Sequence, residues 1–174
     1  MKEPFSYLVD AQLSAMLGSI LVFILVARWY IIPKLKTLRP VTAIVVLLWV
    51  HVPRYFTLIQ FSAQQQGYPI SNAAVMEAVV GDVAGAIIAL LAILAFRRFA
   101  KIGIVLSWIL VVETIADITV GFIRKAHEPV WGKASGVTWL ILDLYIPFIL
   151  ICLPLLVWRL IVWRDEKNSL LRAD

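Results

Sequence analysis

The chain has 174 residues, of which 62% are hydrophobic, and its mean hydropathy is +0.92. Soluble domains are only about half apolar, and one soluble core of this size could not bury so much apolar surface. The net charge is +5, but the basic residues lie in short runs between apolar stretches, as at Lys34-Leu35-Lys36 and Arg97-Arg98. Such runs are typical of loops beside lipid headgroups rather than of a nucleic-acid-binding domain. The sequence therefore predicts an integral membrane protein that binds no nucleic acid.

Two features near the ends of the chain limit its chemistry and processing. Cys152 is the only cysteine, so the chain has no internal disulfide and no Cys-x-x-Cys redox or zinc site. Residues 1–4 lack the basic region and the small-residue cleavage site of a secretory signal. We therefore expect the first apolar stretch to be retained as a helix.

Five apolar segments are long enough to cross a hydrocarbon core, which takes about 20 residues. In chain order they cover approximately residues 6–32, 41–61, 72–96, 102–123 and 137–162. Pro33, Pro40, Pro69 and Pro129 stand in the breaks between these segments, as prolines do between helices. The predicted fold is all-α: a single domain over residues 1–174, built as a bundle of about five transmembrane helices with a short cytoplasmic tail at 163–174.

The charges of the loops predict the orientation of this bundle. The basic residues of the first and third loops are Lys34, Lys36, Arg39, Arg97, Arg98 and Lys101. The loops on the other side carry fewer, and the Gln-rich second loop carries no charge. The positive-inside rule then predicts an N-terminus outside and a C-terminus in the cytoplasm. A bacterial inner membrane is the expected location.

Charged residues inside the predicted spans are the most informative feature of the sequence. The acidic residues deep inside the spans are Glu77, Asp82, Glu113, Asp117 and Asp143, and the only basic residue at such depth is Arg54. Each charge costs at least about 2.5 kcal/mol to insert into a membrane, so we expect these groups to face the bundle interior, a cavity or one another. One arginine cannot neutralise five acids. The excess must be protonated, hydrated or bound to a cation.

Helix geometry suggests that these groups meet in one layer. At about 1.5 Å per residue, they lie between the midplane and the outer face of a core about 30 Å thick. His51 and Arg54 are three residues apart and Glu113 and Asp117 are four apart, so each pair shares a helix face. Asp10, in the first span, could close the layer from another side.

The backbone is expected to be irregular at this level. Pro53 removes the helical hydrogen bond to the carbonyl of Trp49, and Pro147 frees a carbonyl in the last span. Such breaks survive in membranes where neighbouring groups or water satisfy the freed carbonyls. Gly81 and Gly85 have the Gly-x-x-x-Gly spacing that lets another helix approach closely.

The first functional hypothesis is a ligand-binding or catalytic site in the outer half of the bundle. In its enzyme version, Glu113, Asp117 and His51 act as general acid, general base or proton carrier on a small or lipid-soluble substrate. The residues expected to hold the ligand are Arg54, Asp82, Asp143 and Glu77. A structural alternative stays open, in which Arg54 only neutralises a carboxylate and His51 is a hydrogen-bonded core residue.

A divalent cation is conceivable as a cofactor, with His51, Glu113 and Asp117 as candidate ligands. The sequence has no His-x-x-x-His or Glu-x-x-His spacing, which weakens this idea. Haem is not expected, because ligation by His51 and His127 would need both to lie at a similar depth.

Two other functions stay open. The first is a proton-coupled transporter or channel, since intramembrane acids and histidines mark proton relays. Against it, the cytoplasmic half of the spans is almost purely apolar. The second is a non-catalytic accessory subunit of a membrane complex, with Gly81 and Gly85 on its contact face. The expected partners are membrane lipid and a lipid-soluble or small-molecule ligand, and a homo-oligomer or a membrane partner is compatible with the sequence.

Overall fold

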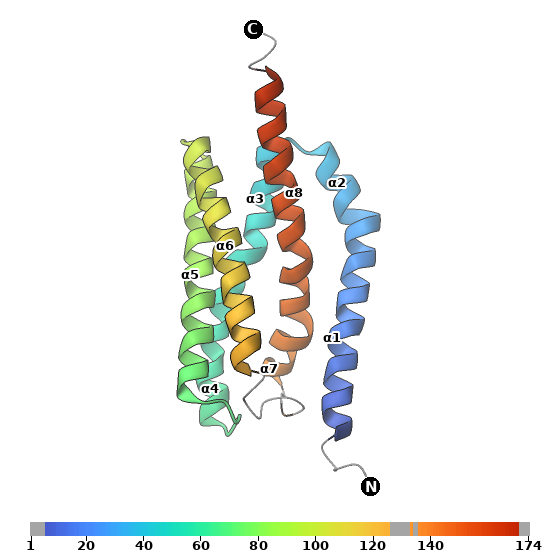
Figure 1. Ribbon diagram of the computed structural model, residues 1–174, viewed down its shortest axis with the longest axis vertical. Helices are drawn as coiled ribbons and strands as arrows, with labels where there is room; N and C mark the ends of the chain where they lie inside the picture. The colour runs from blue at the N-terminus through green and yellow to red at the C-terminus, as the bar shows by residue number, and fades with distance from the viewer. Residues whose placement is uncertain (1–5, 126–132, 134–135, 171–174) are drawn as a thin grey trace.

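The structure is a computed structural model of the chain and describes residues 6–125, 133 and 136–170. Within these residues the chain is helical and contains no strand. Its long helical segments run side by side along the longest axis of the molecule, with the N-terminus at one end and the C-terminus at the other (Figure 1). These observations confirm the prediction of an all-α bundle.

Eleven helical elements build the described part of the chain. They are α1 (Ser6–Val26), η1 (Ala27–Ile31), α2 (Ile32–Thr37), α3 (Pro40–His51), η2 (Val52–Leu58), α4 (Ile59–Gln65), α5 (Asn72–Phe96), α6 (Ala100–Lys125), α7 (Val137–Leu140), η3 (Ile141–Tyr145) and α8 (Ile146–Leu170). Several follow one another without a break, so they combine into a smaller number of long rods.

Five of these rods are long and apolar enough to cross a membrane, as predicted. They run over Leu8–Thr37, Pro40–Gln65, Asn72–Phe96, Ala100–Ile123 and Val137–Arg164. The predicted boundaries differ from these by only a few residues. The largest departure is at the C-terminus, where α8 continues to Leu170, so the segment expected to be a tail begins as helix.

Prolines mark the places where the rods depart from α-helical geometry. Pro53 lies in the 3-10 helix η2, and Pro147 is the second residue of α8, just after the π-helix η3. A proline has no N–H to donate, so the turn before it lacks one α-helical hydrogen bond and can adopt 3-10 or π-helical geometry. The hydroxyl of Tyr145 donates a hydrogen bond of 3.1 Å to the carbonyl of Val50, one turn before the first break. The predicted irregularity is thus confirmed, and a side chain from the fifth rod contacts the backbone beside it.

Tyr145→Phe should lower the free energy of unfolding by about 1 kcal/mol, because the Val50 carbonyl then loses a donor in an apolar environment. The measurement is denaturant or thermal unfolding of the purified protein in detergent. Tyr30→Phe is the matched control. Tyr30 is 69% exposed, so the loss of its hydroxyl should change the free energy of unfolding little. Equal stability of the two variants would contradict a role for the Tyr145 hydroxyl.

The buried residues form two apolar cores along the bundle. The larger contains Ile44, Ala92, Leu110 and Leu156, all fully buried. The smaller consists of Ile70, Ala74, Val75 and Val79. In the second rod, Arg54 of η2 follows the part of the larger core that α3 contributes. In α5, the half-buried Asp82 lies between Val79 of the smaller core and Ala89 of the larger one. The charged layer therefore lies between two cores.

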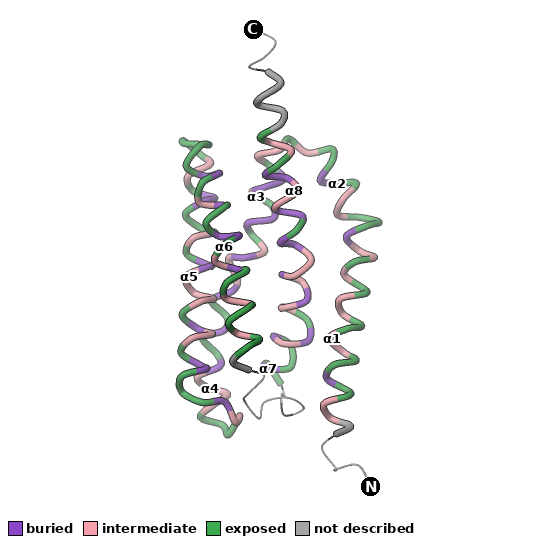
Figure 2. The backbone as a smooth tube through the Cα atoms, in the orientation of Figure 1, coloured by how far each residue is buried: buried purple, intermediate pink, exposed green. Residues whose placement is uncertain are grey.

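The first rod lies at the edge of the bundle, beside α8 (Figure 1). Figure 2 shows that α1 is mostly exposed or half-buried, in contrast to the purple faces of α3 and α8. Phe23 of α1 contacts Phe148 of α8, with ring centroids 5.2 Å apart. Much of the α1 surface is therefore available to lipid, and the rod packs against the rest of the bundle mainly on the side that faces α8.

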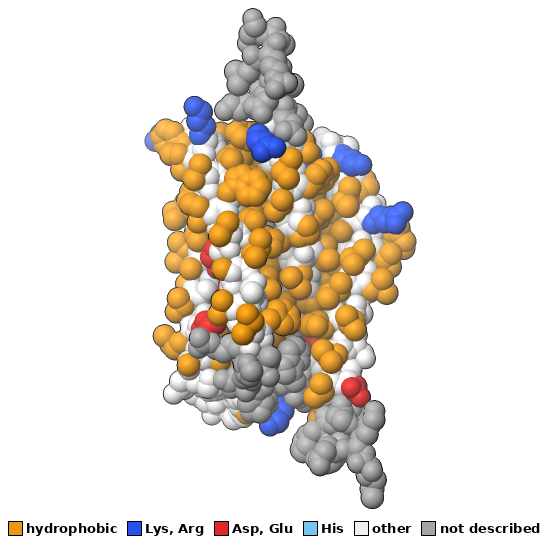
Figure 3. Space-filling model, viewed as in Figure 1, with side chains coloured by type: hydrophobic (Ala, Val, Ile, Leu, Met, Phe, Trp, Pro, Cys, Tyr) orange, Lys and Arg blue, Asp and Glu red, His pale blue; other side chains and the backbone are white. Residues whose placement is uncertain are grey.

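The visible surface of the molecule is largely hydrophobic, and most of its basic side chains gather near one end (Figure 3). We call the end with the α2–α3 and α5–α6 turns the basic end. The acidic side chains visible on this face lie from the middle of the molecule toward the other end. This charge asymmetry is the one on which the predicted orientation rests, and the orientation itself stays a prediction.

Candidate functional site

Arg54 lies at the centre of a network of ion pairs formed by three helical rods. Its Nε lies 2.8 Å from Oδ1 of Asp82, its Nη1 2.8 Å from Oε2 of Glu113, and its Nη2 2.7 Å from Oδ2 of Asp117. The Arg54 side chain is only 1% exposed, whereas the three carboxylates are 17–19% exposed. The predicted convergence of charges from different spans is therefore present in the fold.

All five N–H donors of the Arg54 guanidinium are used within this network. Nη1 also donates to the Thr114 hydroxyl at 2.8 Å, and Nη2 donates a second hydrogen bond to Glu113, at 3.2 Å to Oε1. The Thr114 hydroxyl in turn donates to Oε2 of Glu113 at 3.2 Å. Arginine has five donors in a planar fork, and here each has an acceptor. We call Arg54, Asp82, Glu113, Thr114 and Asp117 the Arg54 network.

The local structure of the second rod, α3 followed by η2, positions Arg54 in the network. The buried face of α3 contains Leu47, Leu48 and His51, and it continues into η2 at Arg54. Thr57, one 3-10 turn further on, donates a hydrogen bond of 2.9 Å to the Arg54 carbonyl. This hydroxyl satisfies a backbone acceptor at the point where the helix geometry changes.

Two glycines of α5 make room for the network. A Cβ added at Gly85 would overlap Nη1 and Cζ of Arg54, and one added at Gly81 would overlap Oδ1 of Asp117. The close approach predicted from the Gly-x-x-x-Gly spacing is therefore real, but the approaching groups belong to the same chain. Arg54 and α6 of the same chain lie against these glycines, and an accessory role in a larger complex stays a prediction.

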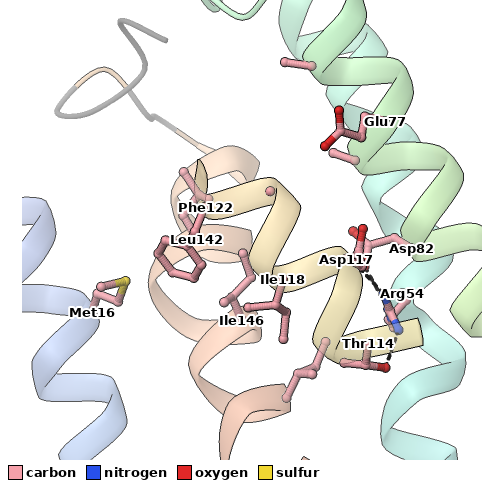
Figure 4. A pocket seen from close by; sticks show the side chains of 14 residues that line it. Met16, Arg54, Glu77, Asp82, Thr114, Asp117, Ile118, Phe122, Leu142 and Ile146 are labelled. Carbon is pink, nitrogen blue, oxygen red and sulfur yellow. Dashed lines mark hydrogen bonds and ion pairs between the residues drawn. The ribbon is translucent and has the colours of Figure 1, made fainter. Parts of the chain in front are cut away.

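A pocket of about 80 Å³ lies beside the network. Its charged and polar lining consists of Arg54, Glu77, Asp82, Thr114 and Asp117. Its other lining residues are Met16, Ala74, Ala78, Ile118, Gly121, Phe122, Leu142, Ile146 and Ile149. In the close view of Figure 4, the charged side chains lie on one side, and Phe122, Leu142 and Met16 lie on the other. The pocket therefore has a polar side and an apolar side.

The formal charge of the network is negative. Three carboxylates surround one guanidinium, which leaves a formal charge of −2 when all of them are ionised. Glu77, which is half-buried, adds a fourth carboxylate to the wall of the pocket. Negative charge in a partly desolvated site attracts cations and protons and repels anions.

His51 is separate from the pocket although it precedes Arg54 by less than a turn. It is fully buried, it does not line the pocket, and neither ring nitrogen has a hydrogen-bond partner. The sequence left open a hydrogen-bonded core histidine and a functional one. The structure shows a packed histidine without hydrogen bonds, and its catalytic role stays a prediction.

Asp143 also lies outside the network. Its side chain is 1% exposed, and neither carboxylate oxygen has a hydrogen-bond partner. Its charge acts on Tyr68, in the turn between α4 and α5. Burial raises the pKa of Tyr68 to about 12, and the Asp143 carboxylate adds to this increase. The expected shared wall of Arg54 and Asp143 is thus not formed, and Asp10, the other expected contributor, is exposed on α1.

The structure does not bring the three candidate metal ligands together around one site. Among residues 6–125, 133 and 136–170, no group of three or more His, Cys, Asp or Glu side chains is arranged to hold a metal ion. Of the three candidate ligands, Glu113 and Asp117 are instead held by Arg54, and His51 lies outside the pocket.

Sequence reasoning missed several residues of the site. Thr114 follows Glu113 directly and is three residues before Asp117, so its helical phase was a readable signal. The apolar side of the pocket had no such signal, because Met16 and Leu142 resemble any other apolar residue of a membrane span. Their contribution depends on which rods are neighbours.

The fold and the site together define a multi-pass type of helical protein, with five membrane-length rods and buried Arg, His and Asp side chains. A family model described as "Domain of unknown function (DUF8737)" matches residues 11–161, and the chain belongs to this family. Searches of curated proteins and of solved structures gave no match. The matched region includes the whole Arg54 network and every residue that lines the pocket.

Proposed function

We propose that this protein binds, in the pocket beside the Arg54 network, a small ligand that carries a positive charge. The observation that carries the proposal is the excess of carboxylates over guanidinium at the pocket wall. A cationic group in the pocket would be stabilised by Asp82, Asp117 and Glu77. Pockets with a mostly apolar lining and a few charged groups are typical ligand sites.

The saturation of Arg54 argues against an anionic ligand. Arg54 is the one basic residue among the expected ligand-holding residues, but each of its five donors already has an acceptor. An anion would have to displace one of these acceptors while also facing carboxylates that outnumber the guanidinium three to one. In this proposal Arg54 orients the acids and reduces the cost of burying them.

The proposal includes the predicted orientation. With the basic end in the cytoplasm, the pocket faces the outer half of a bacterial inner membrane. Neither transport nor an accessory role has an observation that favours it over ligand binding. The core between the network and the basic end is largely apolar, which does not favour transport, and the glycine face of α5 is in contact with Arg54 and α6.

Asp117→Asn should weaken the binding of a small organic cation by about tenfold, which corresponds to about 1.4 kcal/mol. A loss of binding free energy of this size is typical for the removal of one charge-assisted hydrogen bond. The substitution keeps the shape of the side chain and an oxygen for Arg54. Ethylammonium is a suitable probe, and its binding can be followed by the rise in unfolding temperature of the protein in nanodiscs.

The matched control is Asp10→Asn, which removes an exposed acid of α1 that does not line the pocket. It should leave ethylammonium binding unchanged. Acetate and ethanol should not stabilise the wild-type protein, because neither carries a positive charge. The proposal fails if ethylammonium does not stabilise the wild type, or if both variants respond to it as the wild type does.

A further inference from the structure

We propose that the ligand is an amphiphilic amine, with a cationic head at the Arg54 network and an apolar chain on the opposite side of the same pocket. This inference rests on the proposed function and adds the chemical class of the ligand to it. It derives from the separation of the pocket lining into a charged side and an apolar side.

The charged side of the pocket belongs to η2, α5 and α6. Asp82 and Asp117 lie next to Arg54, and Glu77 lies further along α5 toward the end opposite the basic end (Figure 4). These carboxylates come from two rods, so a single amine can contact more than one of them. A primary ammonium has three donors for such contacts.

The apolar side belongs to α6, to the start of the fifth rod and to α1. Ile118 and Phe122 are one turn apart on α6, and Leu142 and Ile146 are one turn apart across the junction of η3 and α8. In Figure 4 these side chains lie between the charged groups and Met16 of α1. They offer a methylene chain a surface that lacks charged groups.

The apolar side borders the surface that faces lipid. Met16 closes the pocket from α1, the rod at the edge of the bundle, and its neighbours Leu13 and Leu17 are 37% and 61% exposed. An alkyl chain could therefore pass from the bilayer into the pocket without crossing water. An amine with such a chain satisfies both sides of the pocket, whereas a hydrated inorganic cation leaves the apolar side without a partner.

Affinity alone cannot test this inference, because longer amines also partition more strongly into the membrane. The position of the chain can test it. We expect an octylamine with a diazirine near the far end of its chain to label Met16, Leu142 or Ile146 after irradiation in nanodiscs. Labelled residues are identified by mass spectrometry, and Leu17 serves as the lipid-facing control on α1. Pocket residues should be labelled about tenfold more than Leu17, as expected for a specific site.

Two comparisons separate this inference from the function on which it rests. Excess ethylammonium should abolish labelling of the pocket residues but not of Leu17. The octanol analogue should label all positions at the level of lipid-facing ones. Suppose that ethylammonium binds but the octylamine labels Met16 and Leu17 equally. The inference of an amphiphilic ligand is then wrong, whereas the proposed binding of a small cation is still supported. If octanol and octylamine label the pocket equally, a positive charge is not needed to bring the chain into the pocket, and the amphiphilic-amine inference is wrong. Cation binding itself is still decided by the ethylammonium assay.

A variant that fills the apolar side adds an independent readout. Ile146→Trp should reduce pocket labelling by octylamine to the level of Leu17, while ethylammonium still raises the unfolding temperature. Retained pocket labelling in a folded Ile146→Trp protein would overturn the proposed chain position. Should this variant fail to fold, the wild-type labelling pattern still decides the question.

Discussion

Arg54→Ala should destabilise the protein by about 3–5 kcal/mol, the usual cost of removing one partner of a buried ion pair. The loss removes the countercharge of Asp82, Glu113 and Asp117 at once, together with a side chain that is only 1% exposed. The carboxylates would then have to take up protons, admit water or move apart. Denaturant unfolding of the purified protein measures the effect.

The matched control is Arg98→Ala, which removes an exposed arginine in the turn between α5 and α6. It should change stability by less than about 0.5 kcal/mol. Equal tolerance of the Arg54 and Arg98 substitutions would contradict a structural role for the network.

A combined variant tests whether charge or packing causes the loss. Arg54→Met with Asp82→Asn, Glu113→Gln and Asp117→Asn removes the cation and its three anions together. It should recover a large part of the stability lost in Arg54→Ala, because the three carboxylates of the network are removed together with their countercharge. If it is as unstable as Arg54→Ala, the packing of the arginine side chain is the dominant contribution.

Gly85→Ala should cost about 3 kcal/mol or more, near the upper end for a single added methyl group. The new Cβ would overlap Nη1 and Cζ of Arg54 and would lie 2.8 Å from Oε2 of Glu113. The guanidinium cannot move aside without losing some of its five hydrogen bonds. The variant should therefore lose both stability and ethylammonium binding, as measured by the same unfolding assay.

Gly18→Ala is the matched control for this substitution. Gly18 lies in α1, and a Cβ there would meet no atom within 4 Å. The change should leave stability unchanged or raise it by up to about 1 kcal/mol, because alanine favours a helix more than glycine does. A Gly85→Ala protein as stable as the Gly18→Ala protein would show that α5 and Arg54 are not in close contact.

The sequence by itself determined the rods and the layer of charges. Hydropathy and length depend on residues that are neighbours in the chain, so the five segments and their approximate ends could be predicted. The effect of Pro53 and Pro147 was equally local, since each removes a donor from its own helix. The cost of burying Arg54 without partners also made an association with acids predictable.

Only the tertiary structure decided which acids Arg54 contacts. Asp82, Glu113 and Asp117 meet it, whereas Asp143, at a predicted depth similar to that of Asp82, lies outside the network. Depth along a helix follows from counting residues, but the direction of a side chain around the bundle depends on which rods pack together. Gly81 and Gly85 set that direction for α5 by admitting α6 and Arg54, and Met16 joins the pocket only because α1 lies beside the fifth rod. Such choices result from contacts between residues far apart in the chain, which a local pattern cannot encode.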